Sequence, residues 1–374
     1  MKRKDVAILD FGSSKIICAV GCMTSDGFAV KALGQCSYDG FYQGEWLAPE
    51  KISDSVATAI KQAEKTYGKA IKDLFIGVPG EFTRVSTGQY ELNFKSKKKI
   101  NNDDIAEIYA RACPNEQLAA LTPISQSVIH YIIDDDRQTV DPLGCQATKL
   151  FGLISYIYAS EYFIDCVTPI VNALGITQTI LVSSCLAEAL FLISPETRDK
   201  QAILIDVGYI TTNVMLVGGD GLLFMKSFSV GGGHISADLC KVLEISYKSA
   251  EQLRQKINLN LEFKPVENYI LSDGTEIKAE QSNEIAKARI EEIGEYIIKC
   301  FDSYSEEIPL YTPVYLTGGG LTYLKGGAEF LSRVLRKKVE TAKTLDPLKN
   351  KPEFASVYGL VELAVKQRAN KRLF

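Results

Sequence analysis

Short apolar runs alternate with amphipathic stretches along most of the 374 residues, and this alternation predicts an α/β fold. Two of the apolar runs, residues 6–9 and 202–205, are built alike. Each ends at an aspartate, Asp10 or Asp206, and continues through a small or hydroxyl-rich turn into a second apolar run. The chain therefore contains the same strand, Asp-x-Gly turn and strand twice.

Other segments show the periodicity of single strands or helices. Short or alternating apolar runs predict strands near residues 28–33, 74–78, 87–94, 127–133, 150–158, 179–182 and 314–317. Apolar residues three and four positions apart predict helices over residues 49–67, 162–174, 186–193, 236–256, 282–301, 327–336 and 355–367, and Asn102 to Asp104 are expected to cap one more.

The order of these elements suggests a hinged body of two lobes. Residues 81–160 differ in sequence pattern from their surroundings, because their expected strands alternate apolar and polar residues and because they contain a lysine run. We interpret them as an inserted subdomain. The expected division is 1–80 for the core of the first lobe, 81–160 for the insertion, 161–200 for the return to the first lobe, 201–355 for the second lobe, and 356–374 for a closing helix and short basic tail. No low-complexity linker separates the lobes, so we expect them to join through a packed core.

Composition excludes several classes of protein. Apolar residues make up 46% of the chain and charged residues 24%, and the formal net charge of -4 argues against nucleic acid as a partner. We expect a cytoplasmic protein, because no secretory signal and no run of about 18 apolar residues is present. Nine cysteines without a Cys-x-x-Cys pair, and only two histidines, give no metal or redox motif.

The paired hairpins carry the candidate chemistry. Turn amides and hydroxyls can bind phosphate oxygens, and a carboxylate beside each turn can hold a hydrated metal ion. The residues expected to do so are Asp10, Gly12, Ser13, Ser14 and Lys15 in the first lobe and Asp206, Gly208, Thr211 and Thr212 in the second, with Asp10 and Asp206 reaching the metal through water. Two glycine runs, Gly231-Gly232-Gly233 and Gly318-Gly319-Gly320, would let the backbone approach a flat or anionic ligand.

Each of these features also has a simpler structural interpretation. Asp-x-Gly is common in ordinary turns, and a lone triple glycine can be a flexible turn. Lys15 can be a phosphate contact or a solvent-facing strand residue. Glu251 and Arg254 lie three apart on a helix face and can pair with each other.

The landmarks, in their order, resemble the FtsA family of bacterial cell-division proteins within the actin-like ATPase superfamily. The similar motifs lie at residues 9–15, 129–131 with 141–144, 230–234 with Asp238, 250–254, 286–293, 316–321 and 358–360. The resemblance implies an actin-like (ribonuclease H-like) two-lobed fold with a duplicated core and an FtsA-type inserted α+β subdomain. It also implies a site for ATP and Mg, with Gly318 to Gly320, Glu251 and Arg254 beside the adenosine.

Three departures from that family weaken the expected site. Where the family carries Asp-x-Gly-Gly-Gly-Thr, this chain has Tyr209 and Ile210, which resist the positive φ angles that glycine permits and whose bulk would stand near the phosphates. Ser184 replaces a glutamate that orders water near the metal, and Asn213 replaces an aspartate. We therefore expect ATP to bind weakly or not at all and hydrolysis to be negligible.

The favoured function is an FtsA-like filament or scaffold protein of cell division or envelope assembly. A working ATPase whose hydrolysis switches assembly, and a sugar- or metabolite-kinase-like enzyme on the same fold, are the alternatives. Expected partners are further copies of the chain and an FtsZ-like or other division protein, with Lys97, Lys98 and Arg289 as candidate contacts. The tail from Lys366 carries four cations and one apolar pair, so we expect at most weak or indirect binding to the inner face of the membrane at the division site.

Overall fold

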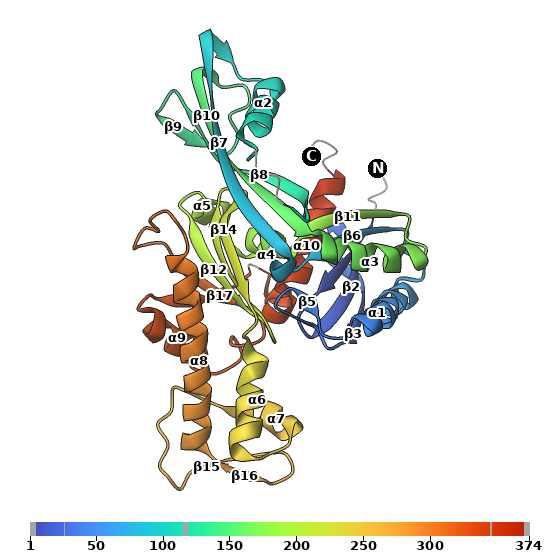
Figure 1. Ribbon diagram of the computed structural model, residues 1–374, viewed down its shortest axis with the longest axis vertical. Helices are drawn as coiled ribbons and strands as arrows, with labels where there is room; N and C mark the ends of the chain where they lie inside the picture. Colours follow the sequence, from blue (N-terminus) through green and yellow to red (C-terminus); the bar gives the residue numbers. More distant parts are fainter. Residues whose placement is uncertain (1–4, 26, 115–118, 345, 370–374) are drawn as a thin grey trace.

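Two five-stranded sheets of identical topology form the centre of the molecule (Figure 1). The computed structural model describes residues 5–25, 27–114, 119–344 and 346–369. The first sheet has the order β3 (Gly27–Ser37), β2 (Lys15–Thr24), β1 (Val6–Phe11), β6 (Asp73–Val78) and β11 (Gln178–Ser183). The second sheet has the order β14 (Gly221–Phe228), β13 (Thr212–Gly218), β12 (Ala202–Val207), β17 (Val314–Thr317) and β18 (Val339–Thr341).

The pairing within each sheet follows the duplicated hairpin. β1 pairs antiparallel with β2 and parallel with β6, and β12 pairs antiparallel with β13 and parallel with β17. β1 and β12 are therefore equivalent strands, and both have their aspartate near the carboxyl end. Ligands of open α/β sheets bind at this end of the parallel strands.

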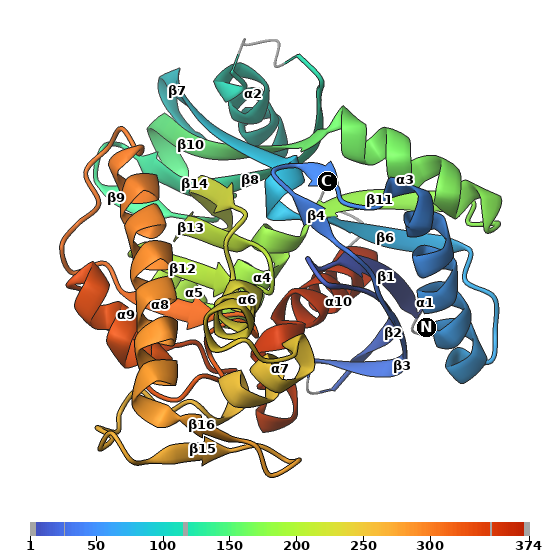
Figure 2. The same cartoon turned by 60° about the horizontal axis from the view of Figure 1, so that its bottom comes forward.

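Helices cover both faces of the first sheet. The apolar faces of α1 (Ile52–Tyr67) and α3 (Glu161–Ala173) pack on one face, and α10 (Ala355–Ala369) packs on the other. In the second lobe α6 (Gly232–Leu243), α7 (Tyr247–Lys256), α8 (Ala279–Asp302) and α9 (Gly327–Leu335) share a core with one face of the sheet. Figure 2 shows the two sheets side by side with α10 between them and the first-lobe helices at the right.

The helix α4 (Ser184–Leu192) joins the lobes. Its side chains are apolar on nearly all sides, which is typical of a helix that is buried all round. Cys185, Leu186 and Ala189 pack with the second sheet, whereas Ala187 packs with the first sheet and α10. The lobes are consequently continuous through a shared core.

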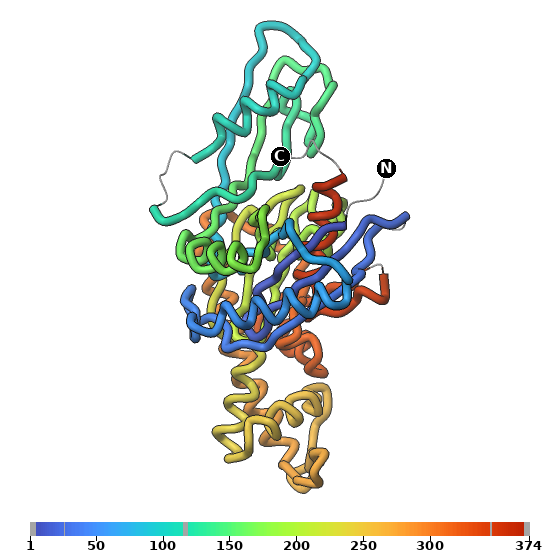
Figure 3. The backbone as a smooth tube through the Cα atoms, turned by 90° about the vertical axis from the view of Figure 1, so that its right-hand side faces the viewer, coloured from blue at the N-terminus to red at the C-terminus, as the bar shows by residue number. Residues whose placement is uncertain are grey.

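The segment expected as an insertion forms its own four-stranded sheet. Its order is β7 (Thr83–Lys99), β10 (Gln146–Ser160), β8 (Leu121–Ile133) and β9 (Arg137–Thr139), and α2 (Asn102–Ala112) packs against it. The side chain of Asn101 caps α2 in a reciprocal pair with Asp104, which satisfies two backbone amides at the helix start. The tube of Figure 3 shows this unit at one end of the elongated molecule.

The far end of the second lobe contains one departure from the expected elements. The helix expected over residues 236–256 is two helices, because Glu244 adopts a left-handed conformation with φ 52° that ends α6, and the side chain of Ser246 caps α7. The remaining short elements are β4 (Phe41–Tyr42), β5 (Glu45–Trp46), α5 (Pro195–Arg198), β15 (Asn268–Ile270) and β16 (Glu276–Lys278). Within the described ranges, no helix combines the length and apolar character needed to cross a bilayer.

Candidate functional site

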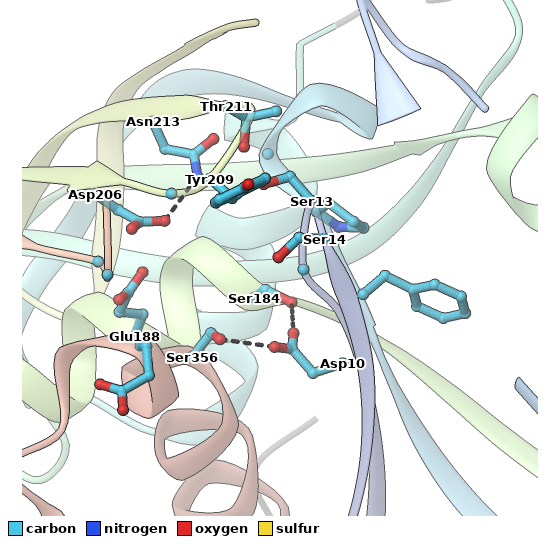
Figure 4. A pocket seen from close by; sticks show the side chains of 18 of the residues that line it. Asp10, Ser13, Ser14, Ser184, Glu188, Asp206, Tyr209, Thr211, Asn213 and Ser356 are labelled. Carbon is cyan, nitrogen blue, oxygen red and sulfur yellow. Dashed lines mark hydrogen bonds between the residues drawn. The ribbon is translucent and has the colours of Figure 1, made fainter. Parts of the chain in front are cut away.

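The two Asp-x-Gly turns meet at one cavity of about 260 Å³ between the lobes (Figure 4). The turn between β1 and β2 contributes five of the residues predicted from the sequence, and the turn between β12 and β13 contributes three. Together with two glycines of the loop after β17, the predicted residues in the lining are Asp10, Gly12, Ser13, Ser14, Lys15, Asp206, Gly208, Thr211, Gly318 and Gly319. The duplicated hairpins thus bring residues about 200 positions apart into one site.

The other predicted residues pack into the second lobe instead of lining this cavity. They are Thr212, Gly231, Gly232, Gly233, Glu251, Arg254 and Gly320. The Gly232 amide donates to the Gly208 carbonyl at 2.9 Å, and a β-carbon at Gly232 would lie 2.3 Å from the Cα of Gly320. These glycines permit close contact between the protein's own loops.

Tyr209 lines the cavity from the second-lobe turn. Figure 4 shows its ring between Ser13 of the first lobe and the side chains of Thr211 and Asn213. Its hydroxyl hydrogen-bonds to the hydroxyl of Tyr247 and donates to Glu251 at 3.3 Å. Neither Tyr209 nor Ile210 has a positive φ, so the expected conflict with a glycine-type turn does not arise and the loop follows a different path.

Glu251 and Arg254 form the ion pair that their spacing allowed. The Arg254 guanidinium contacts the Glu251 carboxylate at 3.2 Å and donates to the Gly320 carbonyl at 3.2 Å. Arg254 is 9% exposed, and its Nε has no hydrogen-bond partner. Both side chains predicted beside an adenosine are therefore engaged within the second lobe.

Both carboxylate oxygens of Asp10 accept hydrogen bonds from hydroxyl groups of the protein. Its Oδ1 accepts a hydrogen bond from Ser184 at 2.9 Å, and its Oδ2 accepts one from Ser356 at 2.7 Å. Burial raises the pKa of Asp10, and the two hydroxyls only oppose this effect. The serine at position 184, where the related family has glutamate, thus holds Asp10 directly.

Asp206 has a similar environment in the second lobe. Its Oδ2 accepts from the amide of Asn213 at 3.0 Å, and the other side of that amide accepts from Ser227. Burial raises the pKa of Asp206 to about 6, and the charge of Asp10 acts in the same direction. With a pKa of about 6, Asp206 is largely ionised at pH 7 and holds a proton only under more acidic conditions.

A third carboxyl group, that of Glu188, was not expected from the sequence. It lies on α4, is 3% exposed, lines the cavity, and accepts a hydrogen bond from Thr317 at 3.3 Å. Burial and the charges of Asp206 and Asp10 raise its pKa well above the ordinary value. The one available signal was a single acid in the otherwise apolar run 184–192. No three His, Cys, Asp or Glu side chains among the described residues are arranged as a metal site.

Lys15 is the cation nearest to this acidic group. It lines the cavity with its ammonium group 4.3 Å from the centre of the Phe354 ring. Burial lowers its pKa, while the charges of Glu353 and Asp10 oppose that change. Since Lys15 forms no ion pair within the described part of the chain, it stays available to an anion.

The predicted partner residues lie far from the cleft. Lys97 is exposed on β7, whereas Lys98 pairs with Asp104 at 2.8 Å and lies over the Phe94 ring. Arg289 of α8 binds both carboxylate oxygens of Asp238 on α6, at 2.6 and 2.9 Å. The end of the basic tail, residues 370–374, lies outside the described residues.

The cavity suits the phosphate end of a Mg-nucleotide better than its nucleoside end. Its phosphate end offers the Ser14 hydroxyl and the ammonium group of Lys15. The side chains expected beside the adenosine are already engaged, because Tyr209 bonds to Glu251 and because Glu251 and Arg254 bind each other. The residues present therefore match a phosphate better than a whole nucleotide.

Comparisons with known proteins agree with this architecture. The family model for cell division protein FtsA matches residues 203–359. FtsA of Enterococcus faecalis is 23% identical over 95% of this chain and 82% of its own length, and FtsA of Bacillus subtilis has the same identity and coverage.

Solved structures show the fold. The PilM-PilN type IV pilus biogenesis complex matches with a TM-score of 0.64 at 15% identity, over 96% of this chain and 98% of the other. MreB5 of Spiroplasma citri bound to AMPPNP matches with a TM-score of 0.58 at 11% identity, over 98% of each chain. The predicted actin-like α/β fold is confirmed, and so is the resemblance to FtsA.

Proposed function

We propose that this FtsA-like chain of actin-like fold acts as a cytoskeletal or scaffold protein in cell division or envelope assembly, and that it binds ATP weakly and hydrolyses it negligibly. The match to FtsA supports the cellular role. The observation that carries the weak nucleotide site is the state of Asp10, whose two carboxylate oxygens are both taken by serine hydroxyls of the protein.

Two α4 residues at the cleft, Ser184 and Glu188, are poorly suited to the chemistry of hydrolysis. A carboxylate base near a metal-bound water must be ionised to accept a proton. Glu188 is the buried acid on α4, but burial raises its pKa well above the ordinary range. The hydroxyl of Ser184 cannot act as a carboxylate base, so neither residue supports efficient hydrolysis.

Nucleotide titration tests this proposal. We expect the purified protein to bind a fluorescent ATP analogue with Mg²⁺ at a Kd of roughly 1 mM or weaker. Phosphate release is expected at the level of a protein-free control. Magnesium-dependent phosphate release that Asp10→Ala abolishes would instead identify a working ATPase whose hydrolysis switches assembly.

The inserted subdomain is the proposed partner surface, with further copies of the chain or an FtsZ-like division protein as the partner. Lys97 is an exposed cation there, whereas Lys98 is paired with Asp104. We expect Lys97→Glu to lower cosedimentation with polymers of the FtsZ from the same cell several-fold, because it reverses one exposed charge. Lys69→Glu, at an exposed site in the first lobe, is the matched control.

Unchanged cosedimentation of Lys97→Glu would remove this surface from the proposal. The role of Arg289 is tested in the same assay, but its pair with Asp238 means that a loss must be checked against the thermal stability of the variant. We further propose recruitment to the inner face of the membrane at the division site through a partner. A fluorescent fusion that stays diffuse in dividing cells would contradict it.

A further inference from the structure

The turns of the two lobes bind each other directly. The backbone amide of Ile210, in the second-lobe turn, donates to the hydroxyl of Ser13, in the first-lobe turn, at 3.0 Å. The same turn is closed on itself by a bond from the Gly208 amide to the Thr211 carbonyl at 2.8 Å. A donor and a hydroxyl that could each face a phosphate are thus satisfied by one another across the cleft.

Tyr209 is fixed at both its backbone and its side chain. Its carbonyl accepts from the Gly233 amide at 2.7 Å, and its ring lies against Gly233, where a β-carbon would come within 2.9 Å. Its hydroxyl reaches Tyr247 and Glu251 on α7. The ring is therefore positioned by contacts from two helices, α6 and α7.

The contacts continue to the loop after β17. Glu251 holds Arg254, and Arg254 donates to the Gly320 carbonyl. Gly320 in turn donates its amide to the Val207 carbonyl at 2.8 Å. Tyr209, the two α7 side chains and the glycine loop form one connected set, which we call the Tyr209 cluster.

We propose that the Tyr209 ring bars the nucleoside part of a nucleotide from the cleft, and that the bond between Ser13 and Ile210 clasps the lobes without any ligand. This inference rests on the proposed function and deepens it, since it adds a steric cause for the weak nucleotide site to the engaged carboxylate of Asp10. A clasp made of the chain's own groups predicts that closure of the lobes does not need ATP.

Substitution of the ring tests the occlusion. We expect Tyr209→Ala to bind the fluorescent ATP analogue with Mg²⁺ at least roughly ten-fold more tightly than the unmutated protein. Tyr209→Phe keeps the ring and loses only the hydroxyl, so it should bind as weakly as the unmutated protein. This matched variant separates the volume of the ring from its hydrogen bonds.

The outcomes distinguish this inference from the proposed function. Equally weak binding by the unmutated protein and Tyr209→Ala, with both folded by circular dichroism, would overturn the inference and leave the proposed function in place. Tight binding by the unmutated protein would contradict the proposed function as well. Tighter binding by both Tyr209→Ala and Tyr209→Phe would show that the hydroxyl contacts, and not the ring, exclude the ligand, which also overturns the inference.

Hydrogen exchange tests the hydrogen bond between Ser13 and Ile210. Its first measurement uses the unmutated protein and so does not depend on whether a variant folds. The Ile210 amide should be protected without nucleotide, and millimolar Mg-ATP should not change its exchange rate. Ser13→Ala is expected to accelerate that exchange at least several-fold, whereas Ser14→Ala, at the next residue, should not. An Ile210 amide that becomes protected only after ATP is added would overturn the proposal, because closure would then depend on the nucleotide.

Discussion

Burial decides the charge of the acidic residues in the cleft. Asp10, Glu188 and Asp206 all line the cavity, and for each of them desolvation is the largest cause of a raised pKa. Three ionised carboxylates at such close quarters would repel each other in a medium less polar than water. The hydroxyl and amide donors around them offset only part of that cost.

Asp206 gives a prediction with a defined pH range. Its pKa is about 6 in the folded protein against 3.8 as the ordinary value, so the folded state holds the proton more tightly than the unfolded state. The resulting stability is fully present below pH 3.8 and is lost as the pH rises through about 6. Asp206→Asn, which is neutral at every pH, should therefore stabilise the protein at pH 8 by about 1–2 kcal/mol, allowing for partial exposure of the side chain.

Urea unfolding at pH 4.5 and pH 8 measures this effect. The gain in the free energy of unfolding from Asp206→Asn should be larger at pH 8 than at pH 4.5. Asp199→Asn, at an exposed turn, provides the control and should show no such difference. A gain that is equal at the two pH values would contradict a raised pKa for Asp206.

For single residues, the sequence predicts which of them lie at the same site but not which partner each one binds. The Asp-x-Gly pattern was sufficient to place Asp10 and Asp206 at one site. The Ser356 hydroxyl that holds Asp10 comes from 346 positions away, and no local pattern connects the two. Glu188 was missed for the same reason, because its position depends on how α4 packs between the lobes.

Periodicity predicted most of the helices and strands, and the exceptions have local causes. The end of α6 lies at Glu244, a residue that rarely adopts the left-handed conformation, so neither glycine nor proline marked the break. β14 is a third antiparallel strand that continues from the second hairpin, as β3 does from the first. Because the first lobe has a third antiparallel strand after its hairpin, the duplication would have predicted β14 in the second lobe.

The contact between the two glycine loops predicts how strongly the position of α6 depends on Gly232. A β-carbon at Gly232 would lie 2.3 Å from both the Cα and the carbonyl oxygen of Gly320, and backbone atoms cannot rotate away as a side chain can. We expect Gly232→Ala to lower the free energy of unfolding by about 3 kcal/mol or more, since α6 must shift to relieve the overlap. Thermal or urea unfolding measures this loss.

Gly319→Ala is the matched control in the neighbouring loop. A β-carbon there would meet the Cβ of Glu353 at 3.0 Å and no other atom closer than 3.8 Å, so a shift of a few tenths of an ångström relieves the contact. Its effect should stay below about 1 kcal/mol. Equal losses for Gly232→Ala and Gly319→Ala would mean that the loops are not as tightly packed as this contact implies.

A hydrogen-bonded bridge outside the cleft also connects the two lobes. Ser229, which follows β14 in the second lobe, donates to Glu81 of the first lobe at 2.6 Å and accepts from the Gln43 amide at 2.7 Å. Glu81 also accepts from the Gly44 amide at 2.9 Å. The duplication of the sheets was evident in the sequence, but this bridge was not, because residues 43, 81 and 229 belong to three unrelated segments.

Removing the Ser229 hydroxyl should loosen the contact between the lobes. Ser229→Ala leaves the Gln43 amide without its acceptor and Glu81 without one donor, and burial already raises the pKa of Glu81. We expect the free energy of unfolding to fall by about 1–2 kcal/mol and exchange of the Gln43 amide to accelerate roughly ten-fold. Hydrogen exchange resolved at residues 42–45 measures the second effect.

Ser227→Ala is the control that distinguishes the loss of a bridge between the lobes from the loss of any hydroxyl group. Ser227 lies two positions away and donates to Asn213, which belongs to the same lobe. Its removal should change the environment of Asp206 while leaving the exchange of Gln43 unaltered. Equal acceleration of Gln43 exchange by both serine variants would mean that Ser229 does not specifically hold the lobes together. The hydrogen bond between Ser13 and Ile210 would then remain as a contact between the turns of the two lobes.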